Sequence, residues 1–149
     1  MVTKTSDRIG VYVMDSYALI ALYLNESGAG HVRSLLNQRR SQHWMTHVNL
    51  GEVFYKLVRE RGEQTANEVL EDVTELPIRF VDADRSLCLE AAAIKGRFPL
   101  SYADCFAAAL SQRVDGKIVT GDLEFTRLED IGLVNVEWLT PKPKTRRAR

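Results

Sequence analysis

Short hydrophobic runs alternate with longer amphipathic segments along most of this chain. Brief runs of β-prone residues predict strands, and apolar residues at helical spacing predict helices between them. The predicted strands are Val11 to Met14, His43 to Met45, Ile78 to Val81, Lys117 to Thr120 and Val134 to Trp138. The predicted helices are Ser16 to Leu24, Gly28 to Arg40, Thr46 to Leu57, Gln64 to Leu76, Asp82 to Lys95 and Ser101 to Arg113. This alternation is typical of an α/β fold, in which helices cover both faces of a parallel sheet.

Four acidic residues interrupt the apolar pattern where a predicted strand ends or a helix begins: Asp15, Glu52, Asp104 and Asp122. In open parallel sheets the functional crevice lies beyond the carboxyl ends of the strands, where Asp15 and Asp122 are expected. A carboxylate in apolar surroundings is costly unless it is paired, hydrogen-bonded or neutralised by a cation. The four acids therefore predict a shared metal site, and hard oxygen ligands suit Mg²⁺ or Mn²⁺.

Each acid also has a purely structural interpretation. Asp15 could be an acid at a helix N-terminus, although Ser16 is also available as the cap. Glu52 could pair with Lys56 one helical turn later. Asp104 belongs to a capping box that begins at Ser101, and Asp122 could be a turn residue. The metal hypothesis depends on the four acids acting together.

Divalent cations at such a site would polarise a phosphoryl oxygen and lower the pKa of a bound water, which is the chemistry of phosphodiester hydrolysis. The sequence has no Ser-His-Asp order, reactive Cys-His pair, P-loop or glycine-rich dinucleotide motif that would indicate another reaction. The spacing of His31, His43 and His47 does not match a zinc motif, so surface or boundary roles are expected for them.

A basic group, Lys56, Arg59 and Arg61, follows Glu52 on the same predicted helix. Such groups usually form a solvated helix face. Their closeness to Glu52 also allows them to form a rim that contacts phosphate groups.

Composition places the chain among soluble single-domain proteins. Its 149 residues are 45% hydrophobic and 27% charged, enough to build one core without metal or disulfide bonds. Cys88 and Cys105 have no neighbour at zinc spacing and suggest a reducing compartment. The longest apolar stretch, Val11 to Leu24, is interrupted by Asp15 and is too short to span a bilayer. We therefore expect a cytoplasmic protein without a membrane partner.

The formal net charge is zero, but the charge is unevenly distributed. The last eight residues hold five of the twenty basic groups and no acid, so the rest of the chain carries a net charge of −5. We expect an N-terminal extension at residues 1–9, a folded domain at 10–140, and a disordered basic tail at 141–149.

The segments around the four acids resemble those of the PIN-domain nucleases, in particular the small VapC-type toxins of prokaryotic toxin–antitoxin systems. The matching segments are Val13 to Leu22, Asn49 to Val53, Leu100 to Ala109 and Ile118 to Phe125. Each motif alone is loose, but their order and spacing together are specific. The resemblance extends from about Val11 to Leu139.

The resemblance implies a three-layer α/β/α sandwich with a short parallel sheet, and a Mg²⁺- or Mn²⁺-dependent endoribonuclease. By this likeness Asp15, Glu52 and Asp104 hold the principal metal, and Asp122 completes the site or helps to bind a second ion. Thr120 matches a hydroxyl residue that orients water or a carboxylate. The expected product ends are a 3′-hydroxyl and a 5′-phosphate. The expected partners are a structured RNA such as tRNA or rRNA, a cognate antitoxin and a second copy of the chain.

Other functions remain open on the sequence alone. A PIN nuclease could process RNA without an antitoxin, and a non-catalytic PIN domain could bind RNA or protein. A haloacid-dehalogenase-like phosphatase also begins with an apolar strand that ends in Asp, but it needs a second Asp where this chain has Tyr17.

Overall fold

The structure is a computed structural model that describes residues 9–141. Apart from Ile9, the predicted N-terminal extension lies outside the described residues, as does the predicted tail beyond Pro141.

The described chain contains five strands and seven α-helices, with one or two α-helices between successive strands. The strands are β1 (Val11–Met14), β2 (Gln42–Thr46), β3 (Arg79–Val81), β4 (Lys117–Thr120) and β5 (Asn135–Trp138). The helices are α1 (Ser16–Tyr23), α2 (Ala29–Leu36), α3 (His47–Arg61), α4 (Glu63–Val73), α5 (Arg85–Arg97), α6 (Tyr102–Val114) and α7 (Thr126–Asp130), and a 3₁₀ turn, η2 (Leu123–Phe125), precedes α7.

All strand pairs are parallel, and the order across the sheet is β3-β2-β1-β4-β5. Val13 of β1 lies opposite Trp44 of β2 on one side and Ile118 of β4 on the other. The chain adds strands outward in one direction from β1 and then returns to the other side of β1 with β4. The boundary between β1 and β4 is therefore the topological switch point, where ligand sites occur in open parallel sheets.

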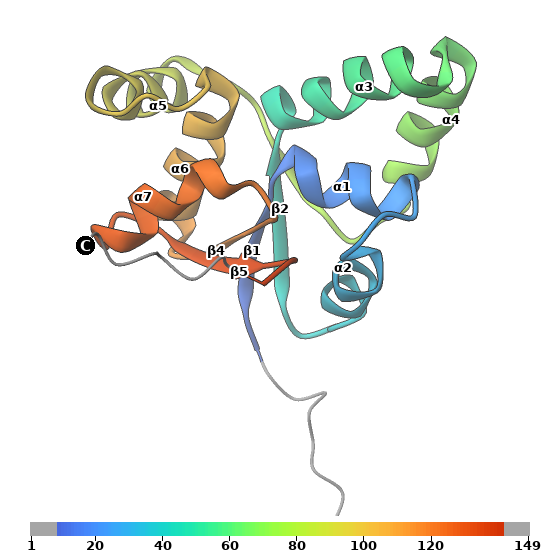
Figure 1. Ribbon diagram of the computed structural model, residues 1–149, viewed down its shortest axis with the longest axis horizontal. Helices are drawn as coiled ribbons and strands as arrows, with labels where there is room; N and C mark the ends of the chain where they lie inside the picture. The colour runs from blue at the N-terminus through green and yellow to red at the C-terminus, as the bar shows by residue number, and fades with distance from the viewer. Residues whose placement is uncertain (1–8, 142–149) are drawn as a thin grey trace, which may run out of the picture.

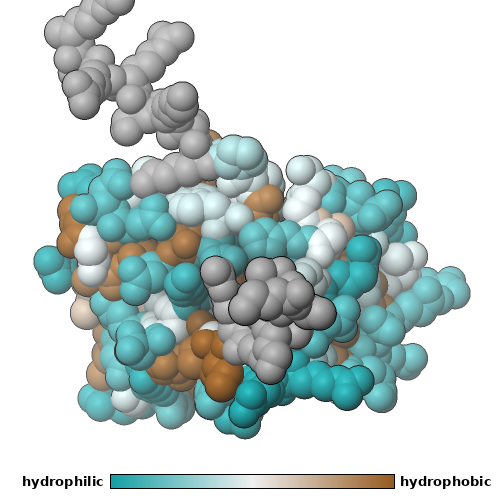
Figure 2. Space-filling model, turned by 90° about the horizontal axis from the view of Figure 1, so that it is seen from below, coloured by the Kyte–Doolittle hydropathy of each residue, from teal (hydrophilic) through white to brown (hydrophobic). Residues whose placement is uncertain are grey.

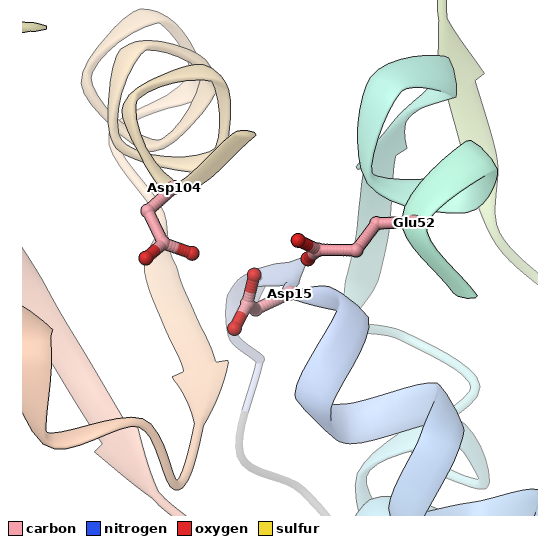
Figure 3. A group of neighbouring side chains, drawn as sticks. All are labelled: Asp15, Glu52 and Asp104. Carbon is pink, nitrogen blue, oxygen red and sulfur yellow. The ribbon is translucent and has the colours of Figure 1, made fainter. Parts of the chain in front are cut away.

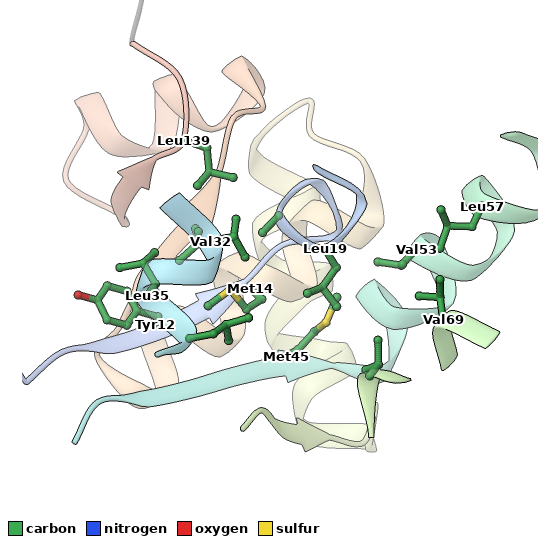
Figure 4. Close-up of a cluster of buried hydrophobic side chains, with 14 of the residues drawn as sticks. Tyr12, Met14, Leu19, Val32, Leu35, Met45, Val53, Leu57, Val69 and Leu139 are labelled. Carbon is green, nitrogen blue, oxygen red and sulfur yellow. The ribbon is translucent and has the colours of Figure 1, made fainter. Parts of the chain in front are cut away.

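Helices cover both faces of the sheet, which confirms the predicted three-layer α/β/α sandwich (Figure 1). One core cluster joins β1 and β2 to α1, α2, α3 and α4, with Met14, Leu19 and Met45 fully buried at its centre (Figure 4). The other cluster lies between the sheet and α5, α6 and α7, around Phe106, Ile118 and Leu128. Three of the four residues of β1 are buried, because a central parallel strand is covered on both faces.

The structure differs from the predicted elements mainly at helix ends. Helix α2 ends at Leu36, although the prediction continued to Arg40. Helix α5 starts at Arg85 because Asp84 caps it, its carboxylate accepting from the backbone N–H of Leu87. The short helices η2 and α7 were not predicted.

None of the helices between Ile9 and Pro141 is long and apolar enough to cross a membrane.

Candidate metal centre

Three of the predicted acids converge at the carboxyl end of the sheet (Figure 3). Asp15 follows β1 directly, Glu52 points inward from the second turn of α3, and Asp104 points inward from the first turn of α6. One carboxylate oxygen of each lies within 4.8 Å of the others. The three elements come from separate parts of the chain, so the tertiary fold rather than local sequence creates this group.

Asp15 lies at the centre of the group and is 1% exposed. Its Oδ2 accepts a hydrogen bond of 2.9 Å from Thr120 Oγ1, whereas its Oδ1 has no hydrogen-bond partner among residues 9–141. Burial raises the pKa of Asp15 to about 7, with the charges of Glu52 and Asp122 adding to the increase and the bond from Thr120 opposing it. A buried carboxylate with one unsatisfied oxygen is a group that a cation would stabilise.

Ser16 does not cap helix α1, contrary to the sequence interpretation. Asp15 occupies the N-cap position, but its side chain makes no capping hydrogen bond. Ser16 is the first helical residue, and its hydroxyl donates to Glu52 Oε1 across the site. Asp15 therefore lies at a helix N-terminus, as its structural interpretation has it, and its carboxylate also faces the other acids (Figure 3).

Glu52 is oriented by several neighbours besides Ser16. Lys56 Nζ lies 3.9 Å from Glu52 Oε2, as the spacing predicted, and the Tyr55 hydroxyl lies 3.4 Å from the same oxygen. The Glu52 side chain is only 12% exposed, whereas the Lys56 side chain is 47% exposed. Glu52 thus has both a structural ion pair and a place beside Asp15.

The structure likewise supports both interpretations of Asp104, as a residue of the helix-capping box and as a member of the acid group. Its backbone N–H donates to Ser101 Oγ at 3.2 Å, so the predicted cap of α6 is present. The carboxylate is nevertheless buried beside Asp15. Burial raises the pKa of Asp104 to about 8, and the charges of Asp15 and Asp122 add to this increase.

Thr120 and Asp122 surround the end of β4. The Thr120 hydroxyl donates to Asp15 and accepts from the backbone N–H of Asp122 at 3.0 Å. Asp122 is half-buried, and its Oδ1 accepts from the backbone N–H of Glu124 at 3.0 Å, which starts η2. The residue between them is Gly121, and the Tyr17 ring packs against its backbone. A Cβ at this position would lie 2.5 Å from that ring.

Glu124 was not predicted as a site residue, but it forms a second group with Asp104 and Asp122, again with oxygens within 4.8 Å. Asp104 is common to both groups. The signal in the sequence was the Asp-Leu-Glu spacing after β4, which places both acids on one turn only if a helical turn forms there. Because η2 is a single turn, its apolar pattern was too short to predict.

A buried amide links the two helices that carry Glu52 and Asp104. Asn49 Nδ2 donates to the Ala103 carbonyl at 3.0 Å, and Asn49 Oδ1 accepts from the Thr46 hydroxyl at 2.5 Å. Thr46 in turn caps α3 by accepting from the Asn49 N–H. Asn49 therefore holds the start of α3 against the start of α6.

The histidines lie outside the acid groups. His43 is buried rather than at the surface, with Nε2 2.6 Å from the Leu35 carbonyl, and burial lowers its pKa. His47 contacts Asp82 at 2.7 Å, and His31 contacts Glu137 at 3.2 Å. These three side chains make structural contacts.

The opposite end of the molecule holds a pocket of about 340 Å³ at the starts of β1, β4 and β5. Figure 2 views this end, where hydrophobic patches lie among hydrophilic residues. None of the four predicted acids lines the pocket, whose lining mixes apolar residues such as Val11 with polar ones such as Lys117 and Asn135. The carboxyl end of the sheet is the stronger candidate site.

The donor set at that end fits a hard divalent cation. It consists of carboxylate oxygens alone, two of the acids have raised pKa values, and one buried oxygen is unsatisfied. Like-charged carboxylates at this separation repel one another unless they hold protons or a cation. Asp15, Glu52 and Asp104 would hold one ion, and Asp104, Asp122 and Glu124 could contribute to another.

Comparison with known proteins identifies relatives of this architecture. The PIN domain family profile matches residues 12–131. VapC20 of Mycobacterium tuberculosis, described as a Sarcin-Ricin loop cleaving toxin, superposes with a TM-score of 0.67 at 16% identity over 78% of this chain and 93% of that chain. A chain of DNA-bound VapBC from Salmonella typhimurium gives 0.68 at 18% identity, over 89% of this chain and 100% of that chain.

A chain of VapBC-1 from nontypeable Haemophilus influenzae gives a TM-score of 0.62 at 19% identity, over 88% of this chain and 99% of that chain. At these identities the similarity establishes a shared fold. No curated protein sequence matches the chain significantly.

Proposed function

The chain belongs to the PIN domain family, and from that membership we propose that it is a metal-dependent endoribonuclease that hydrolyses phosphodiester bonds in structured RNA. We further propose that it is the toxin of a type II toxin–antitoxin pair and acts in the cytoplasm. The fold it shares with the toxin chains of VapBC complexes supports this second step.

The observation that carries the proposal is the unsatisfied Oδ1 of Asp15 at the meeting point of the acids. A folded protein retains such a group at a cost in stability, because a buried carboxylate oxygen without a hydrogen-bond partner is disfavoured. A bound Mg²⁺ or Mn²⁺ would remove that cost.

When bound, the ion would supply Lewis-acid chemistry and a water of lowered pKa for attack on phosphorus. The protein residues position the acids that bind it. Thr120 orients Asp15 through its 2.9 Å hydrogen bond, Ser16 orients Glu52, and the Ser101 cap fixes the start of the helix that carries Asp104. Thr120 is thus proposed as a positioning residue.

The proposed substrate class is tRNA or ribosomal RNA. VapC20 is described as cleaving the Sarcin-Ricin loop, and this chain shares its fold, so the Sarcin-Ricin loop is the first substrate to test. Backbone and base contacts around the acids would set the cleavage site, since the acids themselves recognise no sequence.

The proposed protein partners are a cognate antitoxin and a second copy of the chain. A basic side chain inserted among Asp15, Glu52 and Asp104 would neutralise their mutual repulsion in place of a metal ion. Antitoxin binding and Mn²⁺ binding should therefore compete, which a calorimetric titration with and without the antitoxin would reveal.

The proposal is tested by incubating total cellular RNA with the purified full chain in Mg²⁺, in Mn²⁺ and in EDTA. Wild type is compared with Asp15→Asn and Asp104→Asn. We expect discrete fragments that require the metal and disappear in both variants. Asp115→Asn is the matched control: Asp115 is exposed, follows the far end of α6, and has the left-handed backbone that Asn tolerates.

Two results would contradict the proposal. Cleavage that persists in EDTA or in both acid variants would show that the acid group is not the catalytic site. Binding of RNA without cleavage, by folded protein that binds Mn²⁺ in calorimetry, would favour the non-catalytic binding domain instead.

A further inference from the structure

The outer face of helix α3 carries a row of side chains that leads away from the acids. Tyr55 and Lys56 lie three and four residues after Glu52, and Arg59 lies four residues after Tyr55 and three after Lys56, so the four side chains share one side of the helix. Glu52 points into the acid group, whereas Tyr55, Lys56 and Arg59 are exposed to solvent. The row therefore connects the proposed metal site to the surface.

Tyr55 is unusual among these residues because a large aromatic ring is 44% exposed beside a charged site. Its hydroxyl lies 3.4 Å from Glu52 Oε2, which places the ring next to a predicted metal ligand. The Arg59 guanidinium lies 5.0 Å from the ring centroid, in cation–π range. Tyrosine and arginine thus form one aromatic and cationic surface.

We propose that this surface, defined by Tyr55 and Arg59, stacks an unpaired base of the RNA substrate next to the cleaved phosphate, while Lys56 and Arg59 contact its backbone. The inference rests on the proposed ribonuclease activity. Aromatic rings and arginine planes are the surfaces on which proteins stack single-stranded bases. A ligand that fits must be anionic near Lys56, flat over Tyr55 and within reach of the acids, and a nucleotide meets all three requirements.

Stacking on Tyr55 would narrow the substrate class. A base inside an A-form duplex has both faces covered by its neighbours, so it cannot stack on Tyr55 unless it is unpaired. The enzyme should therefore cleave loops, bulges or single strands and spare continuous duplex RNA.

The test measures binding of a fluorescein-labelled oligouridylate of about eight nucleotides, which is short enough for one stacking site. A series of the same strand carries one abasic ribose at each position in turn. Binding is measured in Mg²⁺ on an Asp104→Asn background to prevent cleavage. Tyr55→Leu keeps the side-chain bulk but removes the ring, and Tyr55→Phe keeps the ring.

We expect Tyr55→Leu to weaken binding of the intact strand by about tenfold, and Tyr55→Phe to weaken it by less than about twofold. At one abasic position the Asp104→Asn parent protein should bind the strand about tenfold more weakly than it binds the intact strand. The protein that also carries Tyr55→Leu should bind these two strands equally. Arg59→Gln should reduce the slope of log K against log salt by the amount expected for the loss of about one phosphate contact. Tyr55→Leu should leave that slope unchanged. A 5-iodouridine at the same position should crosslink to Tyr55.

Equal losses by Tyr55→Leu on intact and abasic strands would overturn the inference. A change of oligomeric state in Tyr55→Leu, seen by sedimentation, would also overturn it by assigning the surface to a protein interface. These failures are separate from failure of the proposed function, which is judged by Mn²⁺ binding and metal-dependent cleavage in wild type. Stacking without metal-dependent cleavage in wild type would show that Tyr55 binds a base, but it would overturn both the proposed nuclease and the placement of that base beside a cleaved phosphate.

Discussion

At the scale of single residues, the site is dominated by two carboxyl groups with raised pKa values. Burial is the main cause for both, raising the pKa of Asp15 to about 7 and that of Asp104 to about 8, and the neighbouring acids add to it. In the metal-free protein both groups therefore hold protons for much of the time at neutral pH. A cation must displace those protons in order to bind.

Metal affinity should consequently depend on pH. We expect affinity for Mn²⁺ to rise between pH 6 and 8, by up to about tenfold per pH unit for each proton displaced, and to level off above about pH 8. Calorimetry in buffers with different ionisation enthalpies would measure both the affinity and the number of protons released. A constant affinity across this range would show that the acids are already ionised.

The same pKa values predict an unusual effect on stability. The pKa of Asp104 is raised from 3.8 to about 8 on folding, so the folded state binds more protons than the unfolded state between these values. The free energy of unfolding of metal-free wild type should thus fall as pH rises from about 4 to about 8. Asp104→Asn removes this penalty, and its Tm in EDTA should exceed that of wild type by an amount that widens over that range, about 2–4 °C for each kcal/mol relieved.

Addition of Mn²⁺ should reverse the order of stability, because wild type gains binding energy that Asp104→Asn does not. Thermal unfolding of both proteins with EDTA and with Mn²⁺ would check this. Asp115→Asn provides the comparison, and it should behave like wild type in both conditions. If Asp104→Asn were less stable than wild type in EDTA at pH 8, the carboxylate would have a stabilising partner when ionised.

At the scale of elements, the site depends on how α3 and α6 lie against each other. Asn49 is fully buried and joins the two helix starts through the Ala103 carbonyl and the Thr46 hydroxyl. Asn49→Ala should destabilise the fold by about 1–3 kcal/mol, because it leaves buried polar groups unpaired. It should also weaken Mn²⁺ binding, since Glu52 and Asp104 would no longer be held at a fixed separation.

Urea unfolding and calorimetry would measure these two effects. Asn67→Ala on α4 serves as the control, because Asn67 is exposed and its side chain donates to the Glu63 carbonyl of its own helix. Loss of stability in Asn49→Ala with unchanged Mn²⁺ affinity would restrict Asn49 to a role in folding.

The elements best predicted from the sequence are the buried ones. The residue bounds of β1 and β4 match the prediction, because a central parallel strand is a short apolar run with a polar residue at its end. Helix ends were harder to predict. Helix α2 ends at Leu36, before Asn37 and the turn that follows, although the polar residues up to Arg40 suit the outer face of a longer helix. The single-turn elements after Asp122 have too few apolar positions to show a period.

The acids could be predicted as a group, but their exact neighbours could not. Asp15 and Asp122 follow from strand ends, and Glu52 and Asp104 from apolar helix sequence. The role of Ser16 was missed because a serine after a strand usually caps a helix, and only the tertiary fold brings its hydroxyl to Glu52. Glu124 was missed for the same reason, since its approach to Asp104 depends on η2.

At the scale of the whole molecule, the uneven distribution of charge matters for a polyanionic substrate. Outside its last eight residues the chain has a net charge of −5, and several of its acids meet at the proposed site. Long-range electrostatics of that part alone would repel RNA. The five basic groups of the C-terminal residues provide compensating charge.

Deletion of residues 142–149 should therefore weaken RNA binding and reduce its dependence on salt, while Mn²⁺ affinity stays unchanged. The slope of log K against log salt, measured for full-length and truncated protein, reports how many phosphate groups the C-terminal residues neutralise. Identical slopes would show that these residues do not bind the RNA backbone.

The position of β4 in the sheet has a consequence during protein synthesis. β1 is made first, but its neighbour β4 begins only at Lys117, and Asp104 and Asp122 also emerge in the last third of the chain. A nascent chain thus carries Asp15 and Glu52 long before it has the strand and the acids that complete the cluster. We expect unfinished chains on the ribosome to be inert, so that the proposed nuclease activity would arise only when a domain is nearly whole, and the proposed antitoxin would have the full interval of synthesis in which to arrive.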